Sequence, residues 1–150
     1  MHIKESYNFK EVDSLISCSG TFKGLNWRSL ADEGYDLVIN LLPERHKHAA
    51  FNEKKAIEEL GIKYIFIPVD WENPLNSDYD SFESAMKLNK DKKIHIHCAA
   101  NYRATGFYAI YAYKNLAWSS NKLYEFIASI WQLSDYPIWD KFISTYVKEN

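Results

Sequence analysis

Short, nearly continuous apolar runs separate helix-like segments along most of the chain. Such runs are typical of strands buried on both faces of a parallel sheet. They predict strands over residues 15–20, at the sheet edge, and over residues 37–42, 62–68 and 93–97. Apolar residues at helical spacing predict helices between them, over residues 25–33, 51–60 and 77–89. Because strands alternate with helices, we expect an α/β fold with a mostly parallel central sheet flanked by helices on both faces.

The last part of the chain is patterned for helices alone. One helix follows the strand at 93–97 and runs to about Trp118, where residues 119–121 break it. Two more follow, one over residues 123–131 and one that Asp135 and Pro137 open. These terminal helices are expected to pack on one side of the sheet. With no linker, repeat or low-complexity tract, residues 1–150 are expected to form a single domain.

Residues 93–106 combine a buried strand, a tight loop and the start of a helix. The loop begins at Cys98 and ends at Arg103. A strand, loop and helix in this order aim backbone N–H groups and the positive end of a helix dipole at one point, which suits a phosphate or another oxyanion. The same field would favour the thiolate form of Cys98, and the planar guanidinium of Arg103 could hold two phosphate oxygens. The segment therefore predicts chemistry on a phosphorylated substrate or a small anion such as phosphate or sulfate.

Composition and charge narrow the class of partner. The formal net charge is −2 and no basic run is present, which argues against a nucleic-acid partner. No apolar run approaches the length of a membrane span, and the first residues lack the apolar core of a signal peptide. Cys18 and Cys98 lie far apart and form no disulfide framework, so a reducing compartment, the cytoplasm, is expected, with Cys18 as a small buried side chain.

The run His97-Cys98-Ala99-Ala100-Asn101-Tyr102-Arg103 resembles the signature loop of the cysteine-dependent protein tyrosine and dual-specificity phosphatases. It is most similar to a bacterial branch with a shortened loop, labelled beta-lactamase-hydrolase-like. The likeness extends to residues 38–41, residues 61–70 and the final helices, from about Ser19 to the C-terminus. It implies a dual-specificity-phosphatase-like fold with the signature loop between the central strand and a helix. It also implies a phosphatase that forms a phosphocysteine intermediate and uses no metal or organic cofactor.

The resemblance further implies roles for individual residues. Cys98 would attack phosphorus, while Arg103 and the loop N–H groups hold the equatorial oxygens. The phosphate-binding residues would be Ala99, Ala100, Asn101, Tyr102 and Arg103. Asp70 matches the family's general acid, which protonates the leaving oxygen and later activates water. Glu72 and Asp78 are the competing carboxylates.

Three further residues are expected to support the loop without touching the phosphate. His97 resembles the family's histidine before the nucleophile, whose hydrogen bonds brace the loop and favour the thiolate. Asn40, near the end of the neighbouring strand, is expected to brace the loop from beneath. Thr105 follows Arg103 by two places and could supply a hydroxyl to the leaving thiolate. His95, on the same strand face as His97, is expected to be a core histidine with its hydrogen bonds satisfied.

The segment departs from the family pattern in three ways. Four residues, rather than the usual five, separate Cys98 from Arg103, so one amide fewer would surround the anion. Asn101 stands in place of the loop glycine, and Asn is among the few residues that visit positive φ with little penalty. Ala104 occupies the position of the Ser or Thr that usually follows the arginine.

Residues outside the loop give weaker indications. Trp71 and Tyr102 could wall the pocket against an aromatic leaving group, or Trp71 could only pack its own loop down. His46 and His48 could suggest a metal pair, but with no third ligand at sensible spacing a solvated loop is the expected interpretation. The signature loop carries no Lys or Arg beyond Arg103, which argues against highly charged substrates. Phosphotyrosine or another small aryl or alkyl phosphate is the expected substrate class, and the pattern carries no indication of oligomeric state.

Two other functions fit parts of the sequence. A rhodanese-type sulfurtransferase has the same loop length and would carry a persulfide on Cys98. Against it, the upstream Gly-His signature that resembles rhodanese is absent and Asp70 would have no role. The other alternative is a catalytically weak module that binds a phosphate or phosphoprotein without turnover, which Asn101 and Ala104 favour.

Overall fold

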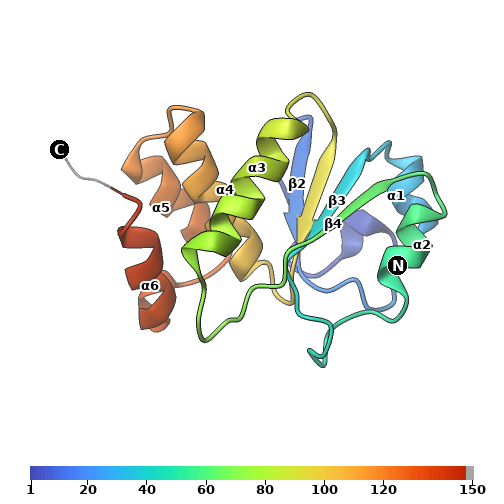
Figure 1. Ribbon diagram of the computed structural model, residues 1–150, viewed down its shortest axis with the longest axis horizontal. Helices are drawn as coiled ribbons and strands as arrows, with labels where there is room; N and C mark the ends of the chain where they lie inside the picture. Colours follow the sequence, from blue (N-terminus) through green and yellow to red (C-terminus); the bar gives the residue numbers. More distant parts are fainter. Residues whose placement is uncertain (148–150) are drawn as a thin grey trace.

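The computed structural model describes residues 1–147, which form a five-stranded sheet between two layers of helices (Figure 1). The strands are β1 (Lys10–Glu11), β2 (Ile16–Ser19), β3 (Leu37–Asn40), β4 (Lys63–Phe66) and β5 (Ile94–His97). Their spatial order is β1-β2-β5-β3-β4, with β1 antiparallel to β2 and the other four strands parallel. The expected α/β fold, its mostly parallel sheet and the central place of the strand before Cys98 are confirmed.

The helices divide between the two faces of the sheet. They are α1 (Arg28–Asp32), α2 (Glu53–Glu58), α3 (Asn76–Leu88), α4 (Tyr102–Asn115), α5 (Ser120–Ala128) and α6 (Pro137–Ser144), with short 3-10 turns η1 (Ile3–Glu5) and η2 (Leu133–Asp135). In Figure 1, α3 to α6 cover one face and α1 and α2 cover the other. The expectation that the terminal helices share one side of the sheet is therefore confirmed. No helix in residues 1–147 is both long enough and apolar enough to cross a membrane.

Two apolar clusters hold the layers together, and strand alternation assigns side chains to them. In β3, Leu37 and Ile39 join the larger cluster beneath α3 to α6, whereas Val38 joins the smaller cluster beneath α1 and α2. Each fully buried side chain of this size contributes about 1.5–3 kcal/mol through removal of apolar surface from water. Cys18 lies in the larger cluster with no exposed surface, and burial raises its pKa to about 12. It is the buried thiol that was expected.

Element boundaries differ from the expected ones where local pattern is weak. The strand at 15–20 is not the sheet edge, because the two-residue strand β1 pairs outside it. Helix α4 ends at Asn115 rather than near Trp118, since Ala117 adopts a left-handed conformation with φ 61°. Helix α3 begins at Asn76, one residue early, and the Asp78 carboxylate accepts the Leu75 N–H at its start.

His95 occupies the middle of β5 with no exposed surface and with both ring nitrogens hydrogen-bonded. Ser17 Oγ lies 2.7 Å from Nδ1 and Ser19 Oγ lies 2.8 Å from Nε2. Because Ser19 Oγ donates to the Gly20 carbonyl, it accepts from Nε2–H, and Ser17 donates to Nδ1. This arrangement fixes one neutral tautomer and confirms the expected core histidine.

The backbone at Gly20 passes against the loop that follows β5. Gly20 forms an isolated antiparallel bridge with Ala100, and the next amide, Thr21 N–H, donates to the Ala99 carbonyl over 2.8 Å. The Gly20 N–H donates in turn to the carbonyl of Tyr7, which ties the N-terminal segment to the same place. Only a residue without Cβ fits so close to another backbone.

Gly20→Ala is expected to destabilise the protein, because the added Cβ would lie 2.5 Å from the Ala99 carbonyl oxygen and 3.0 Å from the Ala100 Cα. Overpacking of this kind costs about 1–3 kcal/mol, which urea denaturation would measure. Gly106→Ala is the matched control, since its Cβ would meet Ile143 and Trp139 at an ordinary 3.5 Å. Because Gly106 lies within α4, Gly106→Ala is expected to leave the free energy of unfolding unchanged or to raise it by up to about 1 kcal/mol. Equal stability of the two variants would contradict the close approach.

The free energy of unfolding is expected to decrease as the pH is lowered below about 6.5, the ordinary pKa of histidine. Burial, and then the neighbouring His97, lower the pKa of His95 well below that value. As the pH falls, His95 binds a proton in the unfolded chain before it does so in the folded chain. The contribution of His95 to stability is therefore present above its pKa in the unfolded chain and is lost as the pH falls below that value. Urea titrations at a series of pH values would show a contribution of at most about 1.4 kcal/mol per pH unit. His95→Gln should be less stable but have a flatter pH profile, and an unchanged slope would refute the assignment.

Candidate active site

The loop from Cys98 to Arg103, hereafter the signature loop, joins the central strand to the longest helix. Cys98 follows the last residue of β5, and α4 begins at Tyr102. Asn101 sits between them with φ 71°, the left-handed conformation that this residue type tolerates. The loop therefore makes its sharp turn at the position where the sequence has Asn in place of Gly.

The carbonyl groups of the signature loop are held from behind by the N-terminal segment. Ala99 O accepts the Thr21 N–H, and Ala100 O accepts Asn8 Nδ2 over 3.0 Å. Asn101 Nδ2 donates back to the Asn8 carbonyl over 2.8 Å. Within residues 1–147, no acceptor is assigned to the N–H groups of Ala99 or Ala100. These free donors and the N-terminus of α4 make the loop suited to an anion.

Arg103 supplies further unpaired donors. Its side chain is 4% exposed, yet Nε and Nη2 have no hydrogen-bond partner in the described part of the chain. Burial lowers the pKa of Arg103, while Cys98 and Asp70 act to raise it. A buried guanidinium with two nitrogens that lack hydrogen-bond acceptors lowers the stability of the fold unless a ligand supplies those acceptors.

A pocket of about 280 Å³ opens over these groups. Its walls are His46, Lys47, His48, Trp71, Cys98, Ala99, Ala100, Tyr102, Arg103 and Tyr136. Cys98 itself is only 1% exposed. The structure thus brings the expected nucleophile, arginine and most of the expected phosphate-binding residues to one cavity, whereas Asn101 turns its side chain toward Asn8.

Asp70 is not one of the residues that line the pocket, although Trp71, which follows it in the chain, is. It is exposed on the loop after β4, where its Oδ1 accepts the Glu72 N–H over 2.9 Å. Its negative charge acts to raise the pKa of Arg103. Of the competing carboxylates, Asp78 is engaged at the start of α3.

Trp71 holds the Asp70 loop against the terminal helices. It stacks on Trp139 at 5.1 Å between ring centroids, and its carbonyl accepts Trp139 Nε1–H over 2.8 Å. Tyr102, Trp131 and Tyr136 complete this aromatic cluster around it. The Arg103 guanidinium also lies 5.5 Å from the Trp71 ring, within range of a cation–π interaction. Trp71 therefore lines the pocket and also packs its loop, so it does more than the packing role that was the second alternative.

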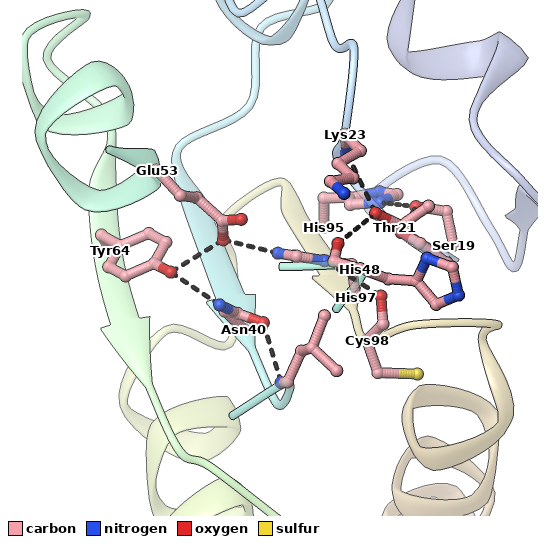
Figure 2. A network of polar contacts seen from close by, with 12 residues as sticks. Ser19, Thr21, Lys23, Asn40, His48, Glu53, Tyr64, His95, His97 and Cys98 are labelled. Atoms are coloured by element: carbon pink, nitrogen blue, oxygen red, sulfur yellow. Dashed lines mark hydrogen bonds and ion pairs between the residues drawn. The ribbon is translucent and has the colours of Figure 1, made fainter. Parts of the chain in front are cut away.

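A buried polar network supports the signature loop from the other side (Figure 2). His97 Nε2 lies 2.6 Å from Glu53 Oε2, and both side chains are buried. Tyr64 donates its hydroxyl to the same Glu53 oxygen and accepts from Asn40 Nδ2. Asn40 Oδ1 accepts the Leu42 N–H. Burial, and then Glu53, raise the pKa of Tyr64, which keeps its proton available for this bond.

The network changes the role expected for Asn40 and adds two residues. Asn40 lies beside His97 in the register of β3 and β5, and its side chain is linked to the His97 imidazole through Tyr64 and Glu53. Phe22 stacks on one face of the His97 imidazole, with the two ring centroids 3.6 Å apart. Glu53 and Tyr64 were missed from the sequence, where Glu53 is one acidic residue among several on a short helix. A signal could have come only from its burial, which the sequence does not display.

Thr105 does not offer its hydroxyl to Cys98. The Thr105 Oγ1 donates to the Asn101 carbonyl over 2.6 Å and accepts Trp131 Nε1–H over 2.9 Å. It ties the end of the signature loop to the aromatic cluster, so it braces the loop from the helix side. Ala104 has no hydroxyl, and the position after Arg103 therefore lacks the group that the family pattern has there.

Residues 46–48 contribute to the pocket, which their expected place in a solvated loop did not anticipate. His48 and Lys47 are exposed, but His46 is half-buried and all three line the cavity. Across residues 1–147 no three His, Cys, Asp or Glu side chains come together in a way that could hold a metal ion.

Comparison with known proteins places this geometry among solved structures. No family model and no curated protein matches the sequence. The DUF442 protein of Shewanella putrefaciens CN-32, a candidate phosphatase, superimposes with a TM-score of 0.85 at 30% identity, covering 96% of this chain and 91% of that one.

Two more distant structures share the fold. P. aeruginosa TpbA gives a TM-score of 0.73 at 12% identity, with 93% of this chain and 84% of that chain covered. The core catalytic domain of the PP-IP phosphatase SIW14 from S. cerevisiae gives 0.70 at 18% identity, with 94% and 86% covered. Given the 30% identity to the Shewanella protein over nearly the full length of both chains, this chain belongs to the cysteine-dependent protein tyrosine and dual-specificity phosphatase superfamily, in the group of that protein.

Proposed function

We propose that this protein hydrolyses a phosphate monoester through a phosphocysteine intermediate on Cys98. The observation that carries the proposal is the buried Arg103, whose Nε and Nη2 have no partner in residues 1–147 and whose guanidinium belongs to the same pocket as the Cys98 thiol. A tetrahedral phosphoryl group presents oxygens to both sets of donors, the guanidinium and the free loop amides.

In the first step the Cys98 thiolate attacks phosphorus in line with the leaving oxygen. The P–O bond to the alcohol breaks as the S–P bond forms, and Asp70 transfers its proton to the departing oxygen. Arg103 and the N–H groups of residues 99–101 hold the three equatorial oxygens through the transition state. The products are the free alcohol and phosphocysteine.

In the second step the Asp70 carboxylate takes a proton from water, and the resulting oxygen nucleophile attacks phosphorus. The S–P bond breaks, inorganic phosphate forms and Cys98 returns as a thiolate. His97, held by Glu53 at Nε2 and lying 3.4 Å from the Cys98 carbonyl at Nδ1, keeps the start of the loop in place during both steps.

Structures of related folds support an organic phosphate as the substrate class. P. aeruginosa TpbA has been solved with pTyr, and PTPMT1 with PI(5)P. The aromatic wall made by Trp71, Tyr102 and Tyr136 suits an aryl or small alkyl leaving group. Phosphotyrosine-like and small aryl or alkyl phosphates are therefore the proposed substrates.

One observation favours a second candidate, a module that binds a phosphate group with little turnover. Ala104 lacks a hydroxyl, and that of Thr105 is engaged with Asn101 and Trp131. A departing Cys98 thiolate would then lack a neighbouring hydroxyl donor, which would slow the second step and leave binding intact.

Cys98→Ser is expected to reduce hydrolysis of p-nitrophenyl phosphate to the background rate, because the phosphocysteine can no longer form. Rapid quenching of the wild type during turnover should place one phosphoryl group on the peptide that contains Cys98, as detected by mass spectrometry. Tungstate binding by the Cys98→Ser variant, measured by calorimetry, serves as the control for an intact pocket. A wild type as inactive as this variant would favour the binding module, and turnover of thiosulfate and cyanide would favour a sulfurtransferase.

Asp70→Asn is expected to lower kcat for p-nitrophenyl phosphate by roughly 10²–10⁴-fold, the usual contribution of a general acid. Oxyanion affinity should stay close to that of the wild type, because Asp70 is not among the residues that line the pocket. Glu72→Gln removes one negative charge from the same loop and is the matched control, with little change expected. Equal effects of the two substitutions on kcat would show that Asp70 acts only through its charge.

A further inference from the structure

The segment His46-Lys47-His48, hereafter the basic loop, adds the positive charge of Lys47 and two imidazole rings to the pocket wall beyond Arg103. None of the described residues that line this pocket is Asp or Glu. The whole chain has a net charge of −2, so its charge distribution is locally reversed at this cavity. A cavity lined by one sign of charge concentrates ligands of the opposite sign.

The basic loop is fixed to the same backbone that holds the signature loop (Figure 2). Thr21 donates its N–H to Ala99 O and its hydroxyl to the carbonyl of His48. Lys23 Nζ donates to the carbonyl of Lys47 over 2.9 Å. One short segment therefore sets the position of both loops, so the basic loop keeps its position relative to Cys98 without a ligand.

Hydrogen bonding within the basic loop orients its first histidine. The His48 N–H donates to His46 Nδ1 over 3.0 Å, which leaves Nε2–H as the free donor of a neutral His46. Burial, and then the charge of Arg103, lower the pKa of His46, with smaller effects from His48 and Lys47. The lowered pKa favours the neutral form of His46, so this side chain would bind an anion through its Nε2–H donor and not through a charge.

A single phosphoryl group does not use all of these donors. The free amides of the signature loop and the two unpaired nitrogens of Arg103 suffice for its oxygens. Lys47 and His48 then remain on the wall without an anionic partner inside the pocket. The volume of about 280 Å³ also exceeds what one phosphate needs and approaches that of pockets for small organic ligands.

We propose that the substrate is a phosphate monoester with a second anionic group, a carboxylate or another phosphate, and that the basic loop binds this second group. The inference rests on the proposed phosphatase function and names its substrate class. It also revises the expectation that highly charged substrates are excluded, which considered only the residues of the signature loop.

The test compares esters that differ only in one meta substituent. 3-Carboxyphenyl phosphate carries the second charge, 3-carbamoylphenyl phosphate is its neutral isostere, and benzene-1,3-diyl bisphosphate carries a phosphate instead. Wild-type kcat/KM is expected to be on the order of tenfold higher for the carboxylate than for the carbamoyl ester, as charge-assisted hydrogen bonds imply. The bisphosphate then shows which kind of anion the loop prefers.

Lys47→Ala is expected to reduce the carboxylate-to-carbamoyl ratio of kcat/KM toward one. Because the readout is a ratio, a general loss of activity cancels. Lys54→Ala is the matched control, since it removes the same charge from an exposed position on α2 that does not line this pocket, and it should keep the wild-type ratio. Wild-type kcat/KM ratios near one for both the carboxylate and the bisphosphate, each relative to the carbamoyl ester, or ratios that Lys47→Ala leaves unchanged, would overturn the inference.

The same esters measured by calorimetry on Cys98→Ser separate this inference from the proposed function. A carboxylate preference in binding without any wild-type hydrolysis would overturn the phosphatase and retain the basic loop as a recognition site. Hydrolysis of all the esters without a preference in rate or binding would do the reverse.

Discussion

The close approach of Gly20 and Thr21 to the signature loop is the constraint on which the site depends. The C=O and N–H bonds of one peptide unit point in opposite directions. Because the N-terminal segment holds the carbonyls of Ala99 and Ala100, the intervening N–H groups point to the opposite side. The anion cradle is therefore a consequence of sheet-side hydrogen bonding, completed before any ligand is present. The same segment positions the basic loop through Thr21.

The features that could be predicted from the sequence are those that residues close together in the chain determine. The central strand, the turn at Asn101 and the start of α4 follow one another directly, so apolar pattern, turn chemistry and helix geometry all act within a few residues. The likeness of residues 97–103 to a known signature then supplied the superfamily, which the 30% identity to the Shewanella protein bears out.

What could not be predicted depends on distant parts of the chain. Glu53 meets His97 across a separation of 44 residues, and nothing in the acidic stretch around Glu53 distinguishes it before folding. The basic loop is hydrogen-bonded by Thr21 and Lys23, which lie 27 and 24 residues from their partners in the chain. The two-residue strand β1 has no hydrophobic period at all, since it is selected by pairing with β2.

The aromatic cluster around Trp71 has a spectroscopic consequence. Three of the five tryptophans in the chain, Trp71, Trp131 and Trp139, lie in contact with one another, and Trp71 lines the pocket. The guanidinium of Arg103 lies over one of these rings, so an anion that draws on Arg103 alters the electric field at an indole. The intrinsic tryptophan fluorescence of this protein should therefore change when an anion binds in the pocket, so binding can be followed without a label.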